Sequence, residues 1–250
     1  MKKIVWIDVG THFGQEHSSI FGANYNFYSV ILRRFLSGNI LNRGKSVSFQ
    51  GLRDIIYART RIRKRSSDFY TVFVEANPKI AYAKDIYLDA DMVFNLALTG
   101  DSQTSVSITK LYLGDGNELS QGSSVFLEKE NVQKGSYIAT LGVSAIDFFS
   151  KLGSYLDEKF PDYDVLLRLN CEGVEDDVIY SAHNSFGNKL KLICGSLKDV
   201  EGVKGLDAAK KLDKFISDNE LLFVYFYSGI DSWSEAHDAV LSLLGRKDKS

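Results

Sequence analysis

The chain has 250 residues, of which 44% are hydrophobic and 25% are charged, and its net charge is −2. This length and composition suffice for a full α/β core, and the small net charge offers no overall attraction for nucleic acid or an anionic membrane. The apolar run at 4–7 ends at Asp8 and is too short for a signal peptide. No later apolar run reaches the length of a membrane span, about 18 residues, so we also expect no transmembrane segment.

Short apolar runs typical of strands alternate with helical patterns along the chain. The strand candidates, in order, are 3–9, 70–75, 91–96, 105–113, 164–170, 189–194 and 221–228. Helical patterns lie at 143–156, 174–183, 206–217 and 232–244. This alternation favours an α/β fold with a mostly parallel sheet and helices on both faces. Because the chain contains neither an internal repeat nor a proline-rich linker, we predict a single domain over residues 1–250.

A basic segment at about 20–68 interrupts the alternation. A turn and one helix normally need about 25 residues to reach the next strand, whereas 61 positions separate Gly14 from Glu75. The segment begins with a helical pattern at 25–36, and from residue 33 to 65 it holds ten basic residues and one acid, a charge of +9. We therefore predict an insertion here.

Four arginines of this insertion stand at every second position, and an extended backbone would place them on one face. They are Arg59, Arg61, Arg63 and Arg65. Two interpretations stay open for them: a solvated basic face, or the binding of an anionic acceptor such as a nucleotide sugar, a phosphorylated glycan or a lipid-linked sugar. Nucleic acid is disfavoured as a partner by the net charge of the chain, and the oligomeric state is left open.

The cysteines and histidines do not form a recognisable metal site. Cys171 and Cys194 each lie in an apolar run, which favours reduced, buried thiols and a cytoplasmic protein. His17, His183 and His237 lack the spacing of zinc ligands, so we expect no metal.

The first strand candidate runs into a glycine-containing turn at 8–14. The dinucleotide fingerprint is Gly-x-Gly-x-x-Gly, but counted from Gly10 the second and third glycine positions hold His12 and Gln15. An acid at the end of this strand suits a cationic ligand, and S-adenosylmethionine carries an ammonium and a sulfonium but no phosphate. Asp8 and Gly10 therefore favour S-adenosylmethionine, with a nicotinamide-dependent oxidoreductase as a less favoured alternative.

Two further strand candidates end in acids. Glu75 follows the second one, where a carboxylate can accept both hydroxyls of a ribose. Glu172 follows the apolar segment 164–170, and because packing does not require a glutamate there, we predict that it is a general base. His12 is the second candidate base. Glu175 and the two aspartates after it are interpreted as acids of the first turn of a helix, without a catalytic role.

Four blocks in this order resemble the FkbM family of S-adenosylmethionine-dependent methyltransferases. They are Ile-Asp-Val-Gly-Thr-His-Phe-Gly at 7–14, Val-Glu-Ala-Asn-Pro at 74–78, Asn-Leu-Ala-Leu at 95–98, and Leu-Arg-Leu-Asn-Cys-Glu-Gly-Val-Glu at 167–175. Gly-Ser-Ser at 122–124 and Ile-Asp-Phe-Phe at 146–149 also look like the family pattern, and the resemblance spans about two-thirds of the chain.

The resemblance implies a Rossmann-like, seven-stranded methyltransferase fold and O-methylation of a sugar, glycan or related small molecule. It also implies cofactor contacts from six residues, namely Asp8, Gly10, Gly14, Glu75, Asn77 and Asn95. The chain departs from the family at Arg168 and Asn170, where the family has lysine and aspartate, and an amide cannot act as a general base. A binding module that keeps the fold without transferring a methyl group is therefore a further alternative.

Overall fold

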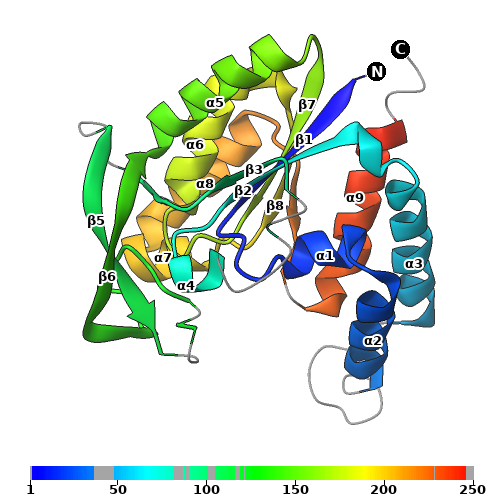
Figure 1. Ribbon diagram of the computed structural model, residues 1–250, viewed down its shortest axis with the longest axis horizontal. Helices are drawn as coiled ribbons and strands as arrows, with labels where there is room; N and C mark the ends of the chain where they lie inside the picture. Colours follow the sequence, from blue (N-terminus) through cyan, green and yellow to red (C-terminus); the bar gives the residue numbers. More distant parts are fainter. Residues whose placement is uncertain are drawn as a thin grey trace.

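The main sheet of the molecule has six parallel strands (Figure 1). The computed structural model describes residues 2–36, 48–81, 87, 90–100, 105–115, 119–120, 122–227 and 229–245. The strands are β1 (Lys3–Val9), β2 (Phe69–Val74), β3 (Met92–Phe94), β7 (Tyr163–Leu169), β8 (Leu190–Gly195) and β9 (Phe223–Tyr225). Their order is β3-β2-β1-β7-β8-β9, and every neighbouring pair is parallel. The chain thus extends the sheet on one side of β1 and then on the other, as in doubly wound Rossmann-like folds.

A second, three-stranded sheet lies at one side of the main sheet (Figure 1). It consists of β4 (Ala97–Thr99), β5 (Val106–Gly114) and β6 (Val132–Ser144), with β6 in the middle, parallel to β4 and antiparallel to β5. Of the seven predicted strand segments, six form the main sheet and 105–113 joins the second one. Sequence analysis missed β6, because many of its residues are exposed and polar and it contains no apolar run.

Helices cover both faces of the main sheet, as predicted. One face carries α5 (Ala145–Lys159), α6 (Glu175–Phe186), α7 (Lys198–Lys204) and α8 (Leu206–Asp218). The other carries α1 (Gln15–Phe21), α2 (Asn24–Phe35), α3 (Phe49–Arg63) and α9 (Trp233–Gly245). A single turn, α4 (Pro78–Ala81), follows β2. The helices predicted at 25–36, 143–156, 174–183, 206–217 and 232–244 are confirmed as α2, α5, α6, α8 and α9.

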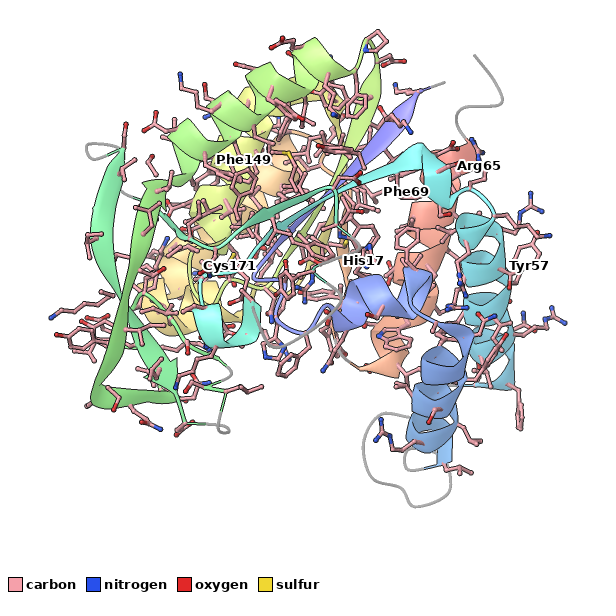
Figure 2. The ribbon with its side chains drawn as sticks, in the orientation of Figure 1. His17, Tyr57, Arg65, Phe69, Phe149 and Cys171 are labelled. Carbon is pink, nitrogen blue, oxygen red and sulfur yellow. The ribbon has the colours of Figure 1, made fainter. Side chains whose placement is uncertain are left out.

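The alternation of side chains along β1 divides the interior into two cores. Val5 and Ile7 pack with Phe149 and the other residues of the α5–α8 side, whereas Ile4 and Trp6 belong to the core under α1, α2, α3 and α9. Figure 2 labels Phe149 in the first core and Phe69 in the second. Because both faces of β1 are covered, the strand is apolar from Ile4 to Ile7.

The arginine segment is helical up to Arg63, so the extended backbone that would place its arginines on one face is not formed. α3 continues to Arg63, and its buried residues Ile55, Ala58 and Ile62 recur every three or four positions, which is the period of a helix packed on one side. This buried side lies along α9. The predicted insertion therefore contributes α2 and α3 to the helical layer on one face of the sheet, and its arginines do not share a face.

Arg59 belongs to the interior of this layer. Its guanidinium donates hydrogen bonds to the backbone oxygens of Ser19 and Gly22 and to Oδ1 of Asn24, at 3.0, 2.5 and 2.8 Å. It also lies 4.0 Å from the centre of the Phe27 ring. Arg59 thus connects α3 to the end of α1 and the start of α2, and it is not available to an acceptor at the surface.

Two further expectations concern the cysteines and membrane-spanning helices. Cys171 and Cys194 are both free thiols, and Cys194 is buried whereas Cys171 is partly exposed. Over the described residues, every helix is too short or too polar to cross a bilayer.

Replacement of Arg59 tests its structural role. We expect Arg59→Leu to lower the free energy of unfolding by about 2–4 kcal/mol, because the hydrogen bonds of the guanidinium to Ser19, Gly22 and Asn24 are lost inside the helical layer. Arg61→Leu, on the exposed side of the same helix, should change it by about 0.5 kcal/mol or less. Urea unfolding followed by tryptophan fluorescence measures both, and equal losses in the two variants would contradict the assignment.

Candidate functional site

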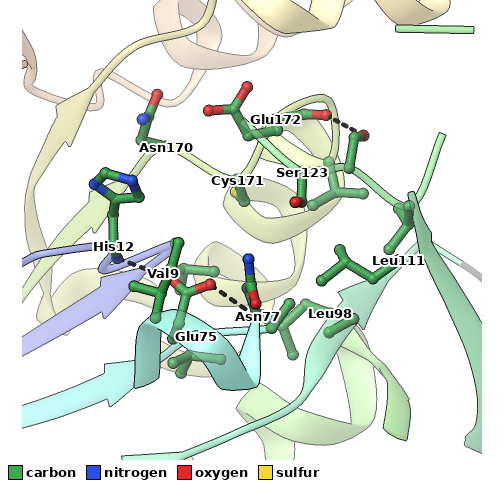
Figure 3. Close-up of a pocket in the computed structure, with 18 of the residues that line it drawn as sticks. Val9, His12, Glu75, Asn77, Leu98, Leu111, Ser123, Asn170, Cys171 and Glu172 are labelled. Carbon is green, nitrogen blue, oxygen red and sulfur yellow. Dashed lines mark hydrogen bonds between the residues drawn. The ribbon is translucent and has the colours of Figure 1, made fainter. Parts of the chain in front are cut away.

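A cavity lies where the carboxyl ends of β1, β2 and β7 meet (Figure 3). From these central strands the chain builds the sheet in opposite directions, which is the position of ligand sites in doubly wound folds. The space enclosed by its lining is about 600 Å³, part of which is open to solvent. Its polar lining includes His12, Glu75, Asn77, Ser123, Asn170 and Glu172, and its apolar lining includes Val9, Leu96, Leu98, Leu111, Val125 and Val174.

Glu75 is held rigidly at the end of β2. Its Oε2 accepts a hydrogen bond of 2.7 Å from the backbone N–H of His12, and its Oε1 accepts one of 2.8 Å from the backbone N–H of Asn77. A carboxylate can accept about four hydrogen bonds, so acceptor positions remain on the side that lines the cavity. Burial raises the pKa of Glu75 to about 7, although the two amide donors oppose this shift.

The two predicted asparagines have different positions. Asn95 is not among the cavity-lining residues, and its Nδ2 donates to the backbone oxygen of Glu75 at 2.7 Å, which supports the turn from behind. Asn77 lines the cavity, but its side chain donates to the backbone oxygen of Leu119 at 3.0 Å and accepts from the backbone N–H of Lys79. Both asparagines therefore position the loops around Glu75.

The glycine turn brings β1 and β7 close together. Gly10 has a φ of 69°, and a β-carbon at this position would lie 2.1 Å from the backbone oxygen of Asn170. Only glycine fits there, because the left-handed conformation and the close strand end exclude a side chain. Gly14, with a φ of 58°, precedes the first residue of α1 and is not part of the cavity lining.

Asp8 lies beneath this turn in a buried ion-pair network. Arg168 binds Oδ1 of Asp8 through Nη1 and Oε2 of Glu16 through Nη2, both at 2.9 Å, and Nη1 also donates to the backbone oxygen of Gly10. All three charged side chains are buried, and burial raises the pKa of Asp8 against the opposing effect of Arg168. Asp8 does not line the cavity, and its carboxylate is engaged inside the protein.

The two predicted bases, His12 and Glu172, both line the cavity. Each has a positive φ, of 56° and 62°, and Figure 3 shows both side chains at the same end of the cavity as Asn170. Burial raises the pKa of Glu172 above its ordinary value, although Lys129 opposes this. Burial also lowers the pKa of His12 to about 4, so its ring is neutral at pH 7.

Lys129 is the residue of this site that sequence reasoning missed. Its ammonium pairs with the carboxylate of Glu172 and lies 3.4 Å from Oδ1 of Asp199. Lys129 stands between two glutamates, and this charged run has the appearance of an ordinary solvated loop. No signal in the sequence singles it out, because its role depends on the approach of the loop before β6 to the end of β7.

The other acids after β7 occupy the first turn of α6, as predicted. Glu175 is the first residue of α6 and is buried, and it accepts hydrogen bonds from the backbone N–H groups of Cys171 and Gly173 at 2.9 and 2.8 Å. Asp176 and Asp177 both pair with Lys204. Within the described ranges, no cluster of three or more histidine, cysteine or acidic side chains has the arrangement of a metal site.

No family model matches the chain, and neither a curated protein nor a solved structure matches it. Any function proposed for the protein therefore depends on its own residues and their arrangement.

The ion-pair network under the cavity can be tested by its stability. We expect Arg168→Met to lower the free energy of unfolding by about 3–5 kcal/mol at neutral pH, because two buried carboxylates lose their counter-ion. The loss should shrink as the pH falls, since protonation of the raised-pKa carboxyl of Asp8 removes its charge in the folded state before it does so in the unfolded state.

The matched control is Lys189→Met, which removes a pair with Asp157 between two exposed side chains. Its effect should be about 1 kcal/mol or less. Calorimetric or urea unfolding at several pH values measures both variants, and a pH-independent loss in Arg168→Met would contradict the account.

Proposed function

We propose that the protein is an S-adenosylmethionine-dependent O-methyltransferase that acts on a hydroxyl of a sugar, glycan or related small molecule, with a Rossmann-like methyltransferase fold. The observation that carries this proposal is Glu75, whose carboxylate is fixed by two backbone amides and lines the cavity at the centre of the sheet. Acceptor oxygens at the end of the second strand suit the two hydroxyls of a ribose.

The remaining lining of the cavity fits an adenosyl group. Leu96, Leu98 and Val125 provide apolar surface that suits an adenine ring. Figure 3 shows Leu98 and Leu111 on the side of the cavity opposite His12. Ribose acceptors and apolar surface in one cavity are what a nucleoside requires.

The charges near the glycine turn favour S-adenosylmethionine over a dinucleotide. Asp8 and Glu16 together can carry two negative charges against the single positive charge of Arg168. A diphosphate would meet this excess of negative charge, whereas an ammonium or sulfonium would be attracted by it. In addition, His12 places an imidazole where the dinucleotide fingerprint needs a bare backbone.

The protein residues would supply alignment and removal of a proton. When bound, S-adenosylmethionine supplies a methyl group that an acceptor oxygen can take up by in-line displacement. The hydroxyl of the acceptor must lose its proton, and Glu172 is the stronger base of the two candidates, because its pKa lies above that of an ordinary glutamate whereas that of His12 is about 4. Lys129 pairs with the Glu172 carboxylate and favours its ionised form, against the larger opposing effect of burial on the pKa.

A binding module without transfer is the second candidate. The observation that favours it is Asn170, which lines the cavity beside Glu172 and cannot accept a proton as a carboxylate would. The two candidates share the nucleoside site and differ in turnover, so detection of a methylated hydroxyl among sugar acceptors would exclude the second.

Titration calorimetry with S-adenosylhomocysteine tests the nucleoside site. We expect binding by the wild type and a loss of about 10-fold or more in affinity for Glu75→Gln, because an amide offers only one acceptor oxygen to the ribose. Glu158→Gln, an exposed glutamate on α5, should bind as the wild type does. Absence of binding by the wild type, or tighter binding of NAD⁺, would contradict the proposal.

The pKa of Glu75 predicts how binding depends on pH. Since the pKa in the free protein is about 7, the carboxylate that accepts ribose hydroxyls is neutralised progressively below pH 7. The affinity for S-adenosylhomocysteine should therefore fall as the pH is lowered from 7 to 5.5 and level off above pH 8. Titration calorimetry across this pH range measures the affinity. In Glu75→Gln the affinity should no longer depend on pH. If it still does, a group other than Glu75 causes the pH dependence.

A further inference from the structure

The outer face of α3 combines basic and aromatic side chains. Opposite its buried row, the residues Phe49, Arg53, Tyr57, Arg61 and Lys64 recur every three or four positions and all are exposed. We call these five residues the α3 face. Phe49 is 79% exposed and Tyr57 is 57% exposed, and Figure 2 shows Tyr57 pointing away from the rest of the molecule.

Helix α2 also exposes large apolar side chains. Tyr28, Leu32 and Leu36 are exposed at spacings of four residues, and Leu32 is 59% exposed. The two helices are connected, since Arg59 and Arg63 of α3 both bind Oδ1 of Asn24 at the start of α2. Large apolar groups exposed on these two connected helices indicate a contact site.

The charge of this region is positive although the chain as a whole is slightly acidic. Ten basic residues and one acid, Asp54, occupy positions 33–65. Gln50 donates a hydrogen bond to Asp54. The pKa of Asp238 on α9 is raised, mainly by burial and to a lesser extent by the negative charge of Asp54. The five residues of the α3 face are all basic or neutral, and the partly exposed Asp54 lies beside them on the same helix.

A hollow at the carboxyl end of α3 concentrates this charge. It is lined by Tyr57, Arg61, Lys64, Arg65, Leu241 and Leu244. Arg61 donates to the hydroxyl of Tyr57 at 3.2 Å, which orients the guanidinium along the helix. A phosphate group in this hollow would meet Arg61, Lys64 and Arg65 beside two leucines, although Arg65 also pairs with Asp68 at 2.8 Å.

We propose that the α3 face, together with the exposed side chains of α2, docks the protein on an anionic lipid membrane surface. Basic side chains interleaved with phenylalanine, tyrosine and leucine are the composition of helices that lie in the membrane interface, where the apolar groups enter the acyl boundary and the cations meet lipid phosphates. Nucleic acid fits less well, because exposed leucines have no role in stacking on bases or contacting phosphates.

This docking is independent of the function of the cavity, because Figure 1 shows α2 and α3 on the side of the molecule away from β5, β6 and α4. A protein anchored in this way would reach acceptors that are themselves membrane-bound. It would also bind vesicles whether or not its cavity binds a nucleoside.

Co-sedimentation of the full chain with vesicles tests the proposal. The two probes are phosphatidylcholine vesicles and phosphatidylcholine vesicles that contain about 30% phosphatidylglycerol. We expect binding to the anionic vesicles only, weakened by added salt. Arg53→Glu with Arg61→Glu should lower the partition coefficient by about 10-fold or more, and Phe49→Ser by a few-fold.

The matched control is Lys210→Glu with Lys211→Glu, which makes the same change of charge on exposed positions of α8, on the other face of the sheet. This variant should stay within about two-fold of the wild type. Equal losses in the two charge-reversed variants, absence of binding to anionic vesicles, or binding to duplex RNA in preference to anionic vesicles would each overturn the proposal. Unfolding curves of all variants show whether they are folded.

Discussion

The guanidinium of Arg168 lies in the centre of the molecule, where it binds carboxylates from the end of β1 and the first turn of α1. A charge in this position would be strongly unfavourable without partners, and the same holds for Asp8 and Glu16 without the guanidinium. The network therefore specifies one relative position of β1, β7 and α1. The glycine turn lies directly above it, since Arg168 also holds the backbone oxygen of Gly10.

The candidate site follows from this arrangement. Gly10 lies in close contact with the backbone of Asn170. The loop after β1 therefore passes close to the end of β2, where the backbone N–H of His12 donates to the carboxylate of Glu75. Glu172 enters the cavity from the end of β7, where Lys129 meets it. A ribose acceptor, a candidate base and the strand ends are thus brought together by the order of the sheet, although they lie up to 160 positions apart in the chain.

The strands of the main sheet and five of the helices could be predicted because their signals are local. The buried strands are apolar runs, and α5, α6, α8 and α9 have helical periods between them. The four alternating arginines at 59–65 were misleading, because the period of two among charged residues is less informative than the period of Ile55, Ala58 and Ile62. β6 was missed because a strand exposed on one side carries no continuous apolar run.

Several residues that line the cavity could be predicted from the sequence, but the partners of the charged residues could not. Gly10, His12, Glu75 and Glu172 were chosen for their place at strand ends and Asn77 for the family resemblance, and the structure brings these five to one cavity. Asp8 was expected to face a ligand, but the identity of its partner depends on the direction in which Arg168 points, which no sequence pattern reveals. The same holds for Lys129. Their roles toward a ligand, and those of the five residues, stay predictions.

The central claim is that a nucleoside binds at the ends of β1 and β2 with its ribose on Glu75. A crystal structure of the protein with S-adenosylhomocysteine tests this most directly. The account predicts both ribose hydroxyls within hydrogen-bond distance, about 2.5–3.2 Å, of the Glu75 carboxylate, with the adenine beside Leu96 and Leu98. A ligand bound elsewhere, or a ribose that does not touch Glu75, would contradict it.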